Sequence, residues 1–275
     1  MIMKRTEIRS VMLAFVLAAT VLAGCSSPEK EAAIAEFRTE CDRVQKEADS
    51  LDALIGECEA LIDQAAAPYD PDTLTALETA TTDARTAIQD LPVQPGKTEE
   101  IISATKELKQ LSYADETVAL TNAKADYETS VKIMEQITNP DEAFVIACLQ
   151  QVEGITGYAA ATEDNDPNGQ LHKQGGYTSA VYFSYEKVNQ NEAYGNTIIE
   201  KGTDCGGQIE VYATAEDAER RSEYLGSFDG TALSSGSHTV LGTILIRTSN
   251  LMTATQQKEL EATLIEVFTT LRDSK

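Results

Sequence analysis

From Ile34 to Ala65, apolar or small side chains recur at alternating steps of three and four residues. Such a heptad pattern is typical of a long amphipathic helix, here roughly 50 Å in length, whose apolar stripe packs against other helices. Charged residues fill the positions between, and no proline interrupts residues 29–67. Because one amphipathic helix cannot bury its own stripe, the pattern predicts a multi-helix bundle.

Two further helical segments complete this region. A proline-containing turn at 68–71 ends the first helix, and the second helix follows with the same spacing from Leu74 to Leu91. A second such turn at 92–96 precedes a third helix, which is expected to run from Thr98 to about Thr138. Short connections favour antiparallel neighbours, so residues 31–139 are predicted to form an antiparallel helical bundle or coiled-coil stalk. The same seam suits pairing between two chains, which leaves the oligomeric state open.

Residues 140–275 mix the periods of strands and helices. Their β-branched and aromatic runs indicate strands, and their 3.6-residue periodicity indicates helices. Together these elements predict a small two-layer α/β sandwich, so the fold class of the chain is α+β. Strands are expected at 180–185, 197–200, 208–213 and 239–247, and helices at 141–152, 215–225 and 253–271.

The N-terminal segment has the order of a bacterial export signal: basic residues, an apolar run at 11–21, then Leu22-Ala23-Gly24-Cys25. The apolar run is shorter than the roughly 20 residues that span a membrane. The tetrapeptide resembles the lipobox of bacterial lipoproteins. That resemblance implies a signal peptide at 1–24, a diacylglycerol thioether on Cys25 often joined by a third acyl chain such as palmitate, and a short lipidated tether at 25–30.

The resemblance implies anchoring to the extracytoplasmic face of the bacterial cell membrane through the acyl chains on Cys25. The formal net charge of −23 argues against nucleic acid as a partner, because phosphate binding needs clusters of Lys and Arg. The chain has no tryptophan, which disfavours a carbohydrate platform of stacked indoles, although tyrosine can partly substitute. An envelope protein or a glycan is the expected partner besides the membrane.

Export would place the four cysteines after Cys25 outside the cytoplasm, where disulfides form. Cys41 and Cys58 lie on one expected helix, about 25 Å apart, which is too far for a bridge. A disulfide between Cys148 and Cys205, joining a helix to the sheet, is the pairing that we expect.

The alternative for Cys205 is a catalytic thiol. Paired with His238, and with Asp204 or Asp229 orienting the imidazole, it would give a thiol enzyme that acts on envelope material. The spacing of these residues carries no known signature, and their glycine-rich surroundings fit tight turns equally well. We therefore expect no catalytic residues and no enzyme.

Residues 162–169 form the densest polar stretch. Asp164, Asp166 and Asn168, followed by glycine, reproduce the first half of a calcium-binding loop of the EF-hand type. Position 12 of that pattern should be glutamate and is Gly175 here, so an ordinary surface turn is the competing interpretation. No cofactor is predicted with the exception of this possible Ca²⁺ site.

The segments at 207–220 (GQIEVYATAEDAER) and 236–249 (GSHTVLGTILIRTS) resemble a module of uncharacterised surface lipoproteins of Gram-positive bacteria. The resemblance covers residues 141–272 and implies an extracellular module, without supplying catalytic residues.

These observations predict a membrane-anchored surface protein that acts by binding or display and catalyses no covalent chemistry. The loops at 162–178, 202–207 and 229–238 are its expected binding rim, because they are rich in glycine and acidic residues. The alternatives are the thiol enzyme and a calcium-stabilised adhesin, and the sequence does not identify the ligand. The rim residues singled out are Glu163, Tyr177, Asp204 and His238.

Overall fold

The computed structural model describes residues 27–231 and 234–272. The expected signal peptide and the lipidation site Cys25 lie outside the described residues. The chain divides into two compact units: one contains the chain up to Lys46 together with Asp90–Ser112, and the other contains Glu47–Gln89 together with the chain from Tyr113 onward. Among the described residues, no helix is long and apolar enough to cross a membrane.

Helix α1 (Pro28–Gln64) confirms the helix that the heptad pattern predicts. Its stripe is buried at Phe37, Val44, Leu51 and Ile55, each no more than 3% exposed, while most of the residues between them are exposed or half-buried. Helix α2 (Pro71–Ala87) follows a turn in which the Asp70 side chain accepts a hydrogen bond from the Asp72 backbone. Propensity alone would leave such helices marginal, so the buried stripe is what stabilises them.

The third expected helix is two helices, α3 (Thr98–Gln110) and α4 (Ala114–Gln136). Arg43 ends α3, because its guanidinium donates to the carbonyls of Leu108 and Leu111 at 2.6 and 3.0 Å. Next to the break, Tyr113 is buried, and its hydroxyl accepts a hydrogen bond from the Gln89 backbone at 3.1 Å. Periodicity does not reveal these side-chain contacts from distant residues, so the sequence predicts one continuous helix.

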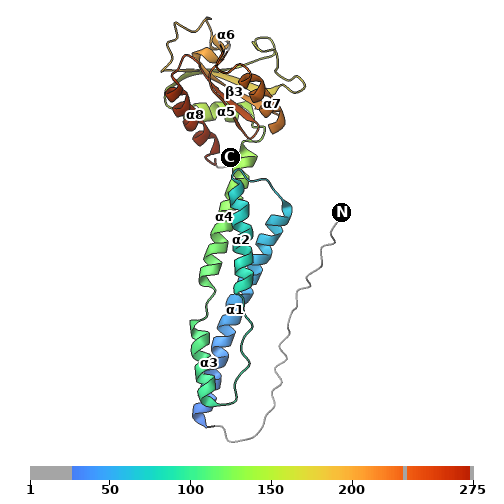
Figure 1. The fold of residues 1–275 in the computed structure, drawn as a ribbon, viewed down its shortest axis with the longest axis vertical. Helices are drawn as coiled ribbons and strands as arrows, with labels where there is room; N and C mark the ends of the chain where they lie inside the picture. Colours follow the sequence, from blue (N-terminus) through green and yellow to red (C-terminus); the bar gives the residue numbers. More distant parts are fainter. Residues whose placement is uncertain (1–26, 232–233, 273–275) are drawn as a thin grey trace. The chain divides into compact units, whose positions relative to one another are not determined.

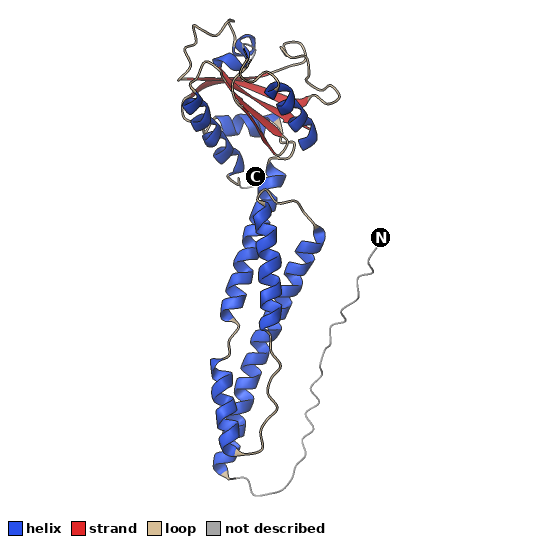
Figure 2. Ribbon diagram, viewed as in Figure 1, coloured by secondary structure: helices blue, strands red, loops and turns tan. Residues whose placement is uncertain are grey.

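Within the second unit, α2 and α4 run antiparallel. One end of the pair is joined where the backbone N–H groups of Tyr69 and Asp70 donate to Ser130, at 3.0 Å to its carbonyl and 2.8 Å to its hydroxyl. Ion pairs link both helices to the end of α1, between Arg85 and Glu59 and between Lys124 and Glu57. Figure 2 shows the helical region followed by the sheet, so the predicted α+β class is confirmed.

The sheet has five antiparallel strands in the order β1-β2-β3-β5-β4. Their bounds are β1 (Ile155–Ala160), β2 (Tyr177–Tyr185), β3 (Gly206–Tyr212), β4 (His238–Leu241) and β5 (Ile244–Thr248). The accompanying helices are α5 (Glu142–Leu149), α6 (Ile198–Lys201), α7 (Ala215–Gly226) and α8 (Ala254–Thr269), with the short 3₁₀ helix η1 (Gly202–Cys205) before β3. Figure 1 shows this sheet together with helices α5, α7 and α8.

Three local expectations differ from the structure. The strand predicted at 197–200 is helix α6, because Thr197 and Glu200 form a reciprocal capping box. The strand predicted at 239–247 is the hairpin β4–β5, which turns at Gly242 with a φ of 59°. Strand β1 was not predicted, since its Gly157 and its alanines have low strand propensity.

Helices cover both faces of the sheet, where the sequence predicted two layers. Helices α5 and α8 pack on the face formed by side chains such as Phe183 and Ile209. Helix α7 packs through Ala218 and Leu225 on the opposite face, which carries Tyr182 among its buried side chains. Buried apolar contacts therefore hold the helices on each side.

The end of α4 is docked into the sheet domain. Ile137 is fully buried in the core beneath α5 and α8, and its carbonyl accepts from the Thr243 backbone at 3.2 Å. The Gln136 amide donates to the carbonyls of Phe268 and Thr270 at 2.8 and 3.0 Å. The Asn139 backbone donates to the Thr243 hydroxyl at 2.6 Å. The helical region therefore joins the domain through an ordered junction.

Candidate functional site

Two of the three loops of the expected rim meet at one end of the sheet. The Ser249 hydroxyl donates to the carbonyl of Asp204 at 2.8 Å, and the Thr248 backbone donates to Ser237 at 3.0 Å. The third loop, 162–178, precedes β2 at the other end of the ladder, where Tyr177 pairs with Tyr212. The predicted rim is therefore divided between the two ends of the sheet.

Asp166 organises the loop before β2. One oxygen of its carboxylate accepts from the backbone of Gln170 and Leu171 at 2.6 and 2.9 Å. The other accepts from the backbone of Asn168 at 3.1 Å and from the Tyr177 hydroxyl. Burial acts to raise the pKa of Asp166, but these hydrogen bonds outweigh it and hold the pKa below its ordinary value.

Two of the three residues that were predicted to bind calcium, Asp166 and Asn168, have other partners. Both oxygens of Asp166 are engaged by its own loop, and the Asn168 amide donates to the Tyr182 hydroxyl at 3.2 Å. Across residues 27–231 and 234–272, no group of three or more His, Cys, Asp or Glu side chains is arranged to hold a metal ion. Asp166 and Asn168 therefore belong to a hydrogen-bonded turn, and calcium binding by Asp164, Asp166 and Asn168 stays a prediction.

Of the remaining rim residues, two lie on exposed or half-buried surface. Glu163 lies 2.9 Å from Nδ1 of His172, and both side chains are exposed. His238 opens β4, and its Nδ1 lies 2.8 Å from the hydroxyl of Ser222 on α7, while its Nε2 lies 3.4 Å from Asp229. The imidazole thus joins β4 to α7, and Asp229, one of the two carboxylates suggested from the sequence, lies beside it.

The two cysteines that were expected to form a disulfide are free thiols in the structure. Cys148 on α5 packs in the core with α8 and the sheet, and burial raises its pKa to about 12. The Cys205 thiol donates to the carbonyls of Gly202 and Phe183 at 3.2 and 3.3 Å, and burial raises its pKa to about 11. Because His238 contacts Ser222 and Asp229, these contacts do not support the proposed Cys205–His238 pair.

The face of the sheet beneath α7 carries a buried ionic network that sequence reasoning missed. Glu210 on β3 is fully buried, and its carboxylate lies 2.9 Å from Arg247 on β5 and 3.3 Å from Arg221 on α7. The Tyr212 hydroxyl donates to the same carboxylate at 2.6 Å. Hydrogen bonds of this kind offset the cost of burying the charges. The signal available in the sequence is a pair of polar residues, Gln208 and Glu210, at alternate positions of an otherwise apolar strand.

Gln208 extends the network toward the loop at 229–238. Its Oε1 accepts from Nη1 of Arg247 at 2.9 Å, and Nη2 of Arg247 donates to the Ser235 hydroxyl at 3.0 Å. The Gln208 side chain is fully buried, and its Nε2 has no hydrogen-bond partner among the described residues. This unsatisfied donor distinguishes the network from an ordinary buried ion pair.

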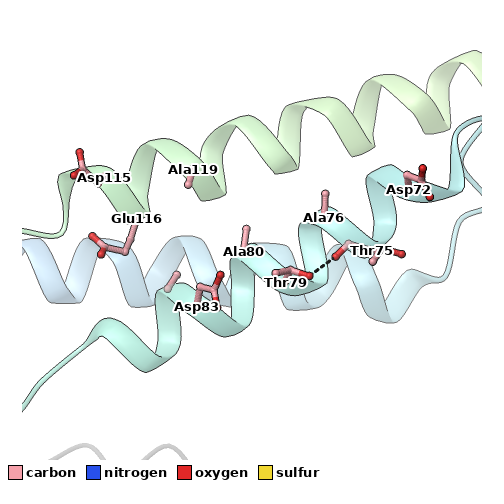
Figure 3. A pocket seen from close by; sticks show the side chains of 10 residues that line it. Asp72, Thr75, Ala76, Thr79, Ala80, Asp83, Asp115, Glu116 and Ala119 are labelled. Atoms are coloured by element: carbon pink, nitrogen blue, oxygen red, sulfur yellow. Dashed lines mark hydrogen bonds between the residues drawn. The ribbon is translucent and has the colours of Figure 1, made fainter.

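A groove of about 670 Å³ lies between α2 and α4 (Figure 3). The floor of the groove consists of small alanine and threonine side chains. It is largely apolar, because the Thr79 hydroxyl already donates to the carbonyl of Thr75 in its own helix. Acidic side chains flank it, and none of the described residues that line it is basic. The groove therefore offers a small-residue floor with carboxylates at its rim. The lining residues are Asp72, Thr75, Ala76, Thr79, Ala80, Asp83, Ala84, Asp115, Glu116 and Ala119.

Comparison with protein-family models, with curated proteins and with solved structures finds no match to this chain.

Proposed function

We propose that the chain is a lipoprotein held on the extracytoplasmic face of a bacterial membrane by acyl chains on Cys25. In this proposal the helical region displays the α+β domain, which binds an envelope protein or glycan without covalent chemistry. The lipobox resemblance supports the anchor, and the acidic charge of the chain disfavours contact between its surface and anionic lipid.

The ordered junction at 136–139 carries the proposal of display. The Gln136 side chain and the Ile137 and Asn139 backbones are all hydrogen-bonded to the sheet domain. A display role requires the helical region to control where the domain is held, and these contacts supply that control. A domain on a flexible linker would instead sample many orientations.

The start of α1 fits the same role. The helix begins at Pro28, three residues after Cys25, and continues for 37 residues. At 1.5 Å per residue such a helix is about 55 Å long. A helix that starts so close to the acyl chains suits a protein whose binding domain must stand clear of lipid.

The environment of the thiols favours binding over thiol catalysis. A nucleophilic cysteine needs a lowered pKa and access to substrate. Cys148 and Cys205 have raised pKa values and are fully buried. Beneath α7, the sheet face carries a network of buried polar groups in which the Gln208 amide donor is unsatisfied, which suits recognition of a ligand.

Metabolic labelling with an alkyne analogue of palmitate tests the anchor. The wild-type protein is expected to carry the label and to sediment with membranes, whereas Cys25→Ser is expected to lose both. Cys41→Ser is the matched control, since it removes a thiol from α1 and should keep the label. An unlabelled wild-type protein in the soluble fraction would contradict the proposal.

The rotational freedom of the α+β domain tests display. A dye is attached at Tyr194→Cys, a position that is 94% exposed, and its anisotropy decay is recorded. The domain is expected to tumble with α4 in the parent protein, and to gain a fast component when Gly-Ser-Gly-Ser is inserted after Asn139. Equal fast components in both proteins would show that the junction does not hold the domain.

A further inference from the structure

The buried amide of Gln208 requires an acceptor that the described chain does not supply. Its orientation is fixed, because Oε1 accepts from Arg247 and a flipped amide would place two donors against each other. Nε2 therefore remains a buried donor without a partner among the described residues. Such groups are rare in folded proteins, because their desolvation is not offset.

The same network has more positive than negative charge in direct contact. Arg221 and Arg247 both contact Glu210, and in the described part of the chain no other carboxylate forms an ion pair with either guanidinium. Asp166 approaches this face through Tyr177, but its oxygens are occupied by the hydrogen bonds of its own loop. Two cations thus share one anion, in a chain whose formal net charge is −23.

Tyr182 adds a further polar group beside the amide. It is the register partner of Gln208 across β2 and β3, and it is buried on the same face. Its hydroxyl accepts from Asn168, while the described residues provide no acceptor for its own proton. The unused hydrogen-bonding capacity here consists of donors, so the complementary group is an acceptor with negative charge.

We propose that this face of the sheet binds the carboxylate of a ligand, with one oxygen accepting from Nε2 of Gln208 and with its charge balancing the second guanidinium. The proposal rests on the binding role proposed above and names its ligand class. A carboxylate fits better than a phosphate because its single charge equals the excess of the network. Its two oxygens also suit planar guanidinium and amide donors.

The open side of the network lies beside α7. Arg221 is 18% exposed, and Ser235, which contacts Arg247, is half-buried. The Arg221 guanidinium lies 5.5 Å from the ring of Tyr224, which is 57% exposed and packs edge-on against Phe228. A ligand that enters here would meet the exposed Tyr224 and the half-buried Phe228 next to the cation, which suits an apolar group adjoining the carboxylate.

Thermal unfolding of the purified lipoprotein tests the proposal. Sodium acetate is compared with sodium chloride at equal ionic strength, and acetate is expected to raise the melting temperature in a saturable way. A short peptide with a free C-terminus, the same peptide amidated, and galacturonate then distinguish a peptide terminus from an acidic sugar. If the free peptide alone reproduces the shift, the source is a peptide terminus; if galacturonate does, it is a sugar acid.

Gln208→Glu supplies the missing charge from within the chain. If the network binds a carboxylate, this variant is expected to fold, to melt at or above the wild-type temperature, and to lose the acetate shift. Gln89→Glu adds the same charge at an exposed site away from the network and should keep that shift. A Gln208→Glu protein that melts well below Gln89→Glu would contradict the proposal.

The side-chain amide signal of Gln208 gives a readout that does not depend on the variant folding. In the ¹⁵N-labelled wild-type protein this signal is expected to move with acetate and to stay fixed with chloride. An unmoved signal, together with equal melting temperatures in the two salts, would show that the donor is satisfied by water and overturn the proposal. Palmitate labelling of Cys25 is unaffected by that result, so failure of the ligand class and failure of the anchor remain distinguishable.

Discussion

Nη1 of Arg247 lies 2.9 Å from Oε1 of Glu210, at the centre of a sheet where the two side chains are 7% and 0% exposed. The two residues come from adjacent strands, β5 and β3, so the pair crosses the ladder beneath α7. Removing one partner of such a pair leaves a buried charge without compensation, which costs far more than the pair itself contributes.

Glu210→Gln is therefore expected to lower the free energy of unfolding by about 3–5 kcal/mol, measured by urea denaturation. The variant keeps the size of the side chain but leaves Arg247 and Arg221 without their carboxylate. Glu216→Gln is the control: Glu216 forms an exposed pair with Arg220 on the same helix that covers the network, and its loss should leave the midpoint unchanged. Equal midpoints for all three proteins would mean that the network contributes nothing to stability.

The helical region follows closely from the sequence, because one physical signal dominates it. The heptad stripe places Phe37, Val44, Leu51 and Ile55 in the core, as the pattern predicts. The break before α4 does not follow, since it depends on the Arg43 guanidinium reaching the carbonyls that end α3. Contacts between residues so far apart in sequence leave no trace in local periodicity.

The sheet domain is predicted in class and less well in detail. The β-branched run Thr197-Ile198-Ile199 looks like a strand by composition, yet the side chains of Thr197 and Glu200 cap a helix. For His238, the sequence offers Asp204 or Asp229 as the neighbouring carboxylate, and in the structure Asp229 lies beside it, whereas its contact with Ser222 was not foreseen. The ionic network was missed because its members lie on β3, β5 and α7, and only the pairing of those elements brings them together.

Asp166 makes stability depend on pH below the neutral range. Its pKa is lower in the folded protein than the ordinary value of 3.8, so its contribution is complete above that value and is lost as the pH falls through the folded pKa. The difference in melting temperature between wild type and Asp166→Asn is expected to be constant above about pH 5 and to shrink on further acidification. A ¹³C titration of the carboxyl carbon checks the direction independently. A difference that grows with acid would show that Asp166 is not the carboxylate stabilised by this loop.

The cysteines are expected to differ in reactivity toward iodoacetamide at pH 8. Cys148 and Cys205 should stay unmodified in the native protein, because both are fully buried and burial raises their pKa values to about 12 and 11. Cys41, which is half-buried, should react first. In urea, Cys41, Cys58, Cys148 and Cys205 should all react. Mass spectrometry of the digested peptides determines the order in which the cysteines are modified. Rapid native labelling of Cys205 would restore the thiol-enzyme alternative, and a peptide containing Cys148 bridged to Cys205 would contradict the free thiols.

Gln136 is expected to control how firmly α4 holds the sheet domain. Its amide donates to the carbonyls of Phe268 and Thr270, and its Oε1 accepts from the Arg272 backbone at 3.1 Å. Gln136→Leu removes all three hydrogen bonds and should lower the free energy of unfolding by about 1–3 kcal/mol. Gln151→Leu is the control, since its amide makes one long hydrogen bond, of 3.4 Å, to Ala147. Amide hydrogen exchange should quicken at Arg272, just beyond the end of α8, in Gln136→Leu, because the backbone N–H of Arg272 loses its acceptor. If both variants lose the same stability and exchange alike, the junction is held by the burial of apolar side chains, and the polar contacts of Gln136 add nothing to it.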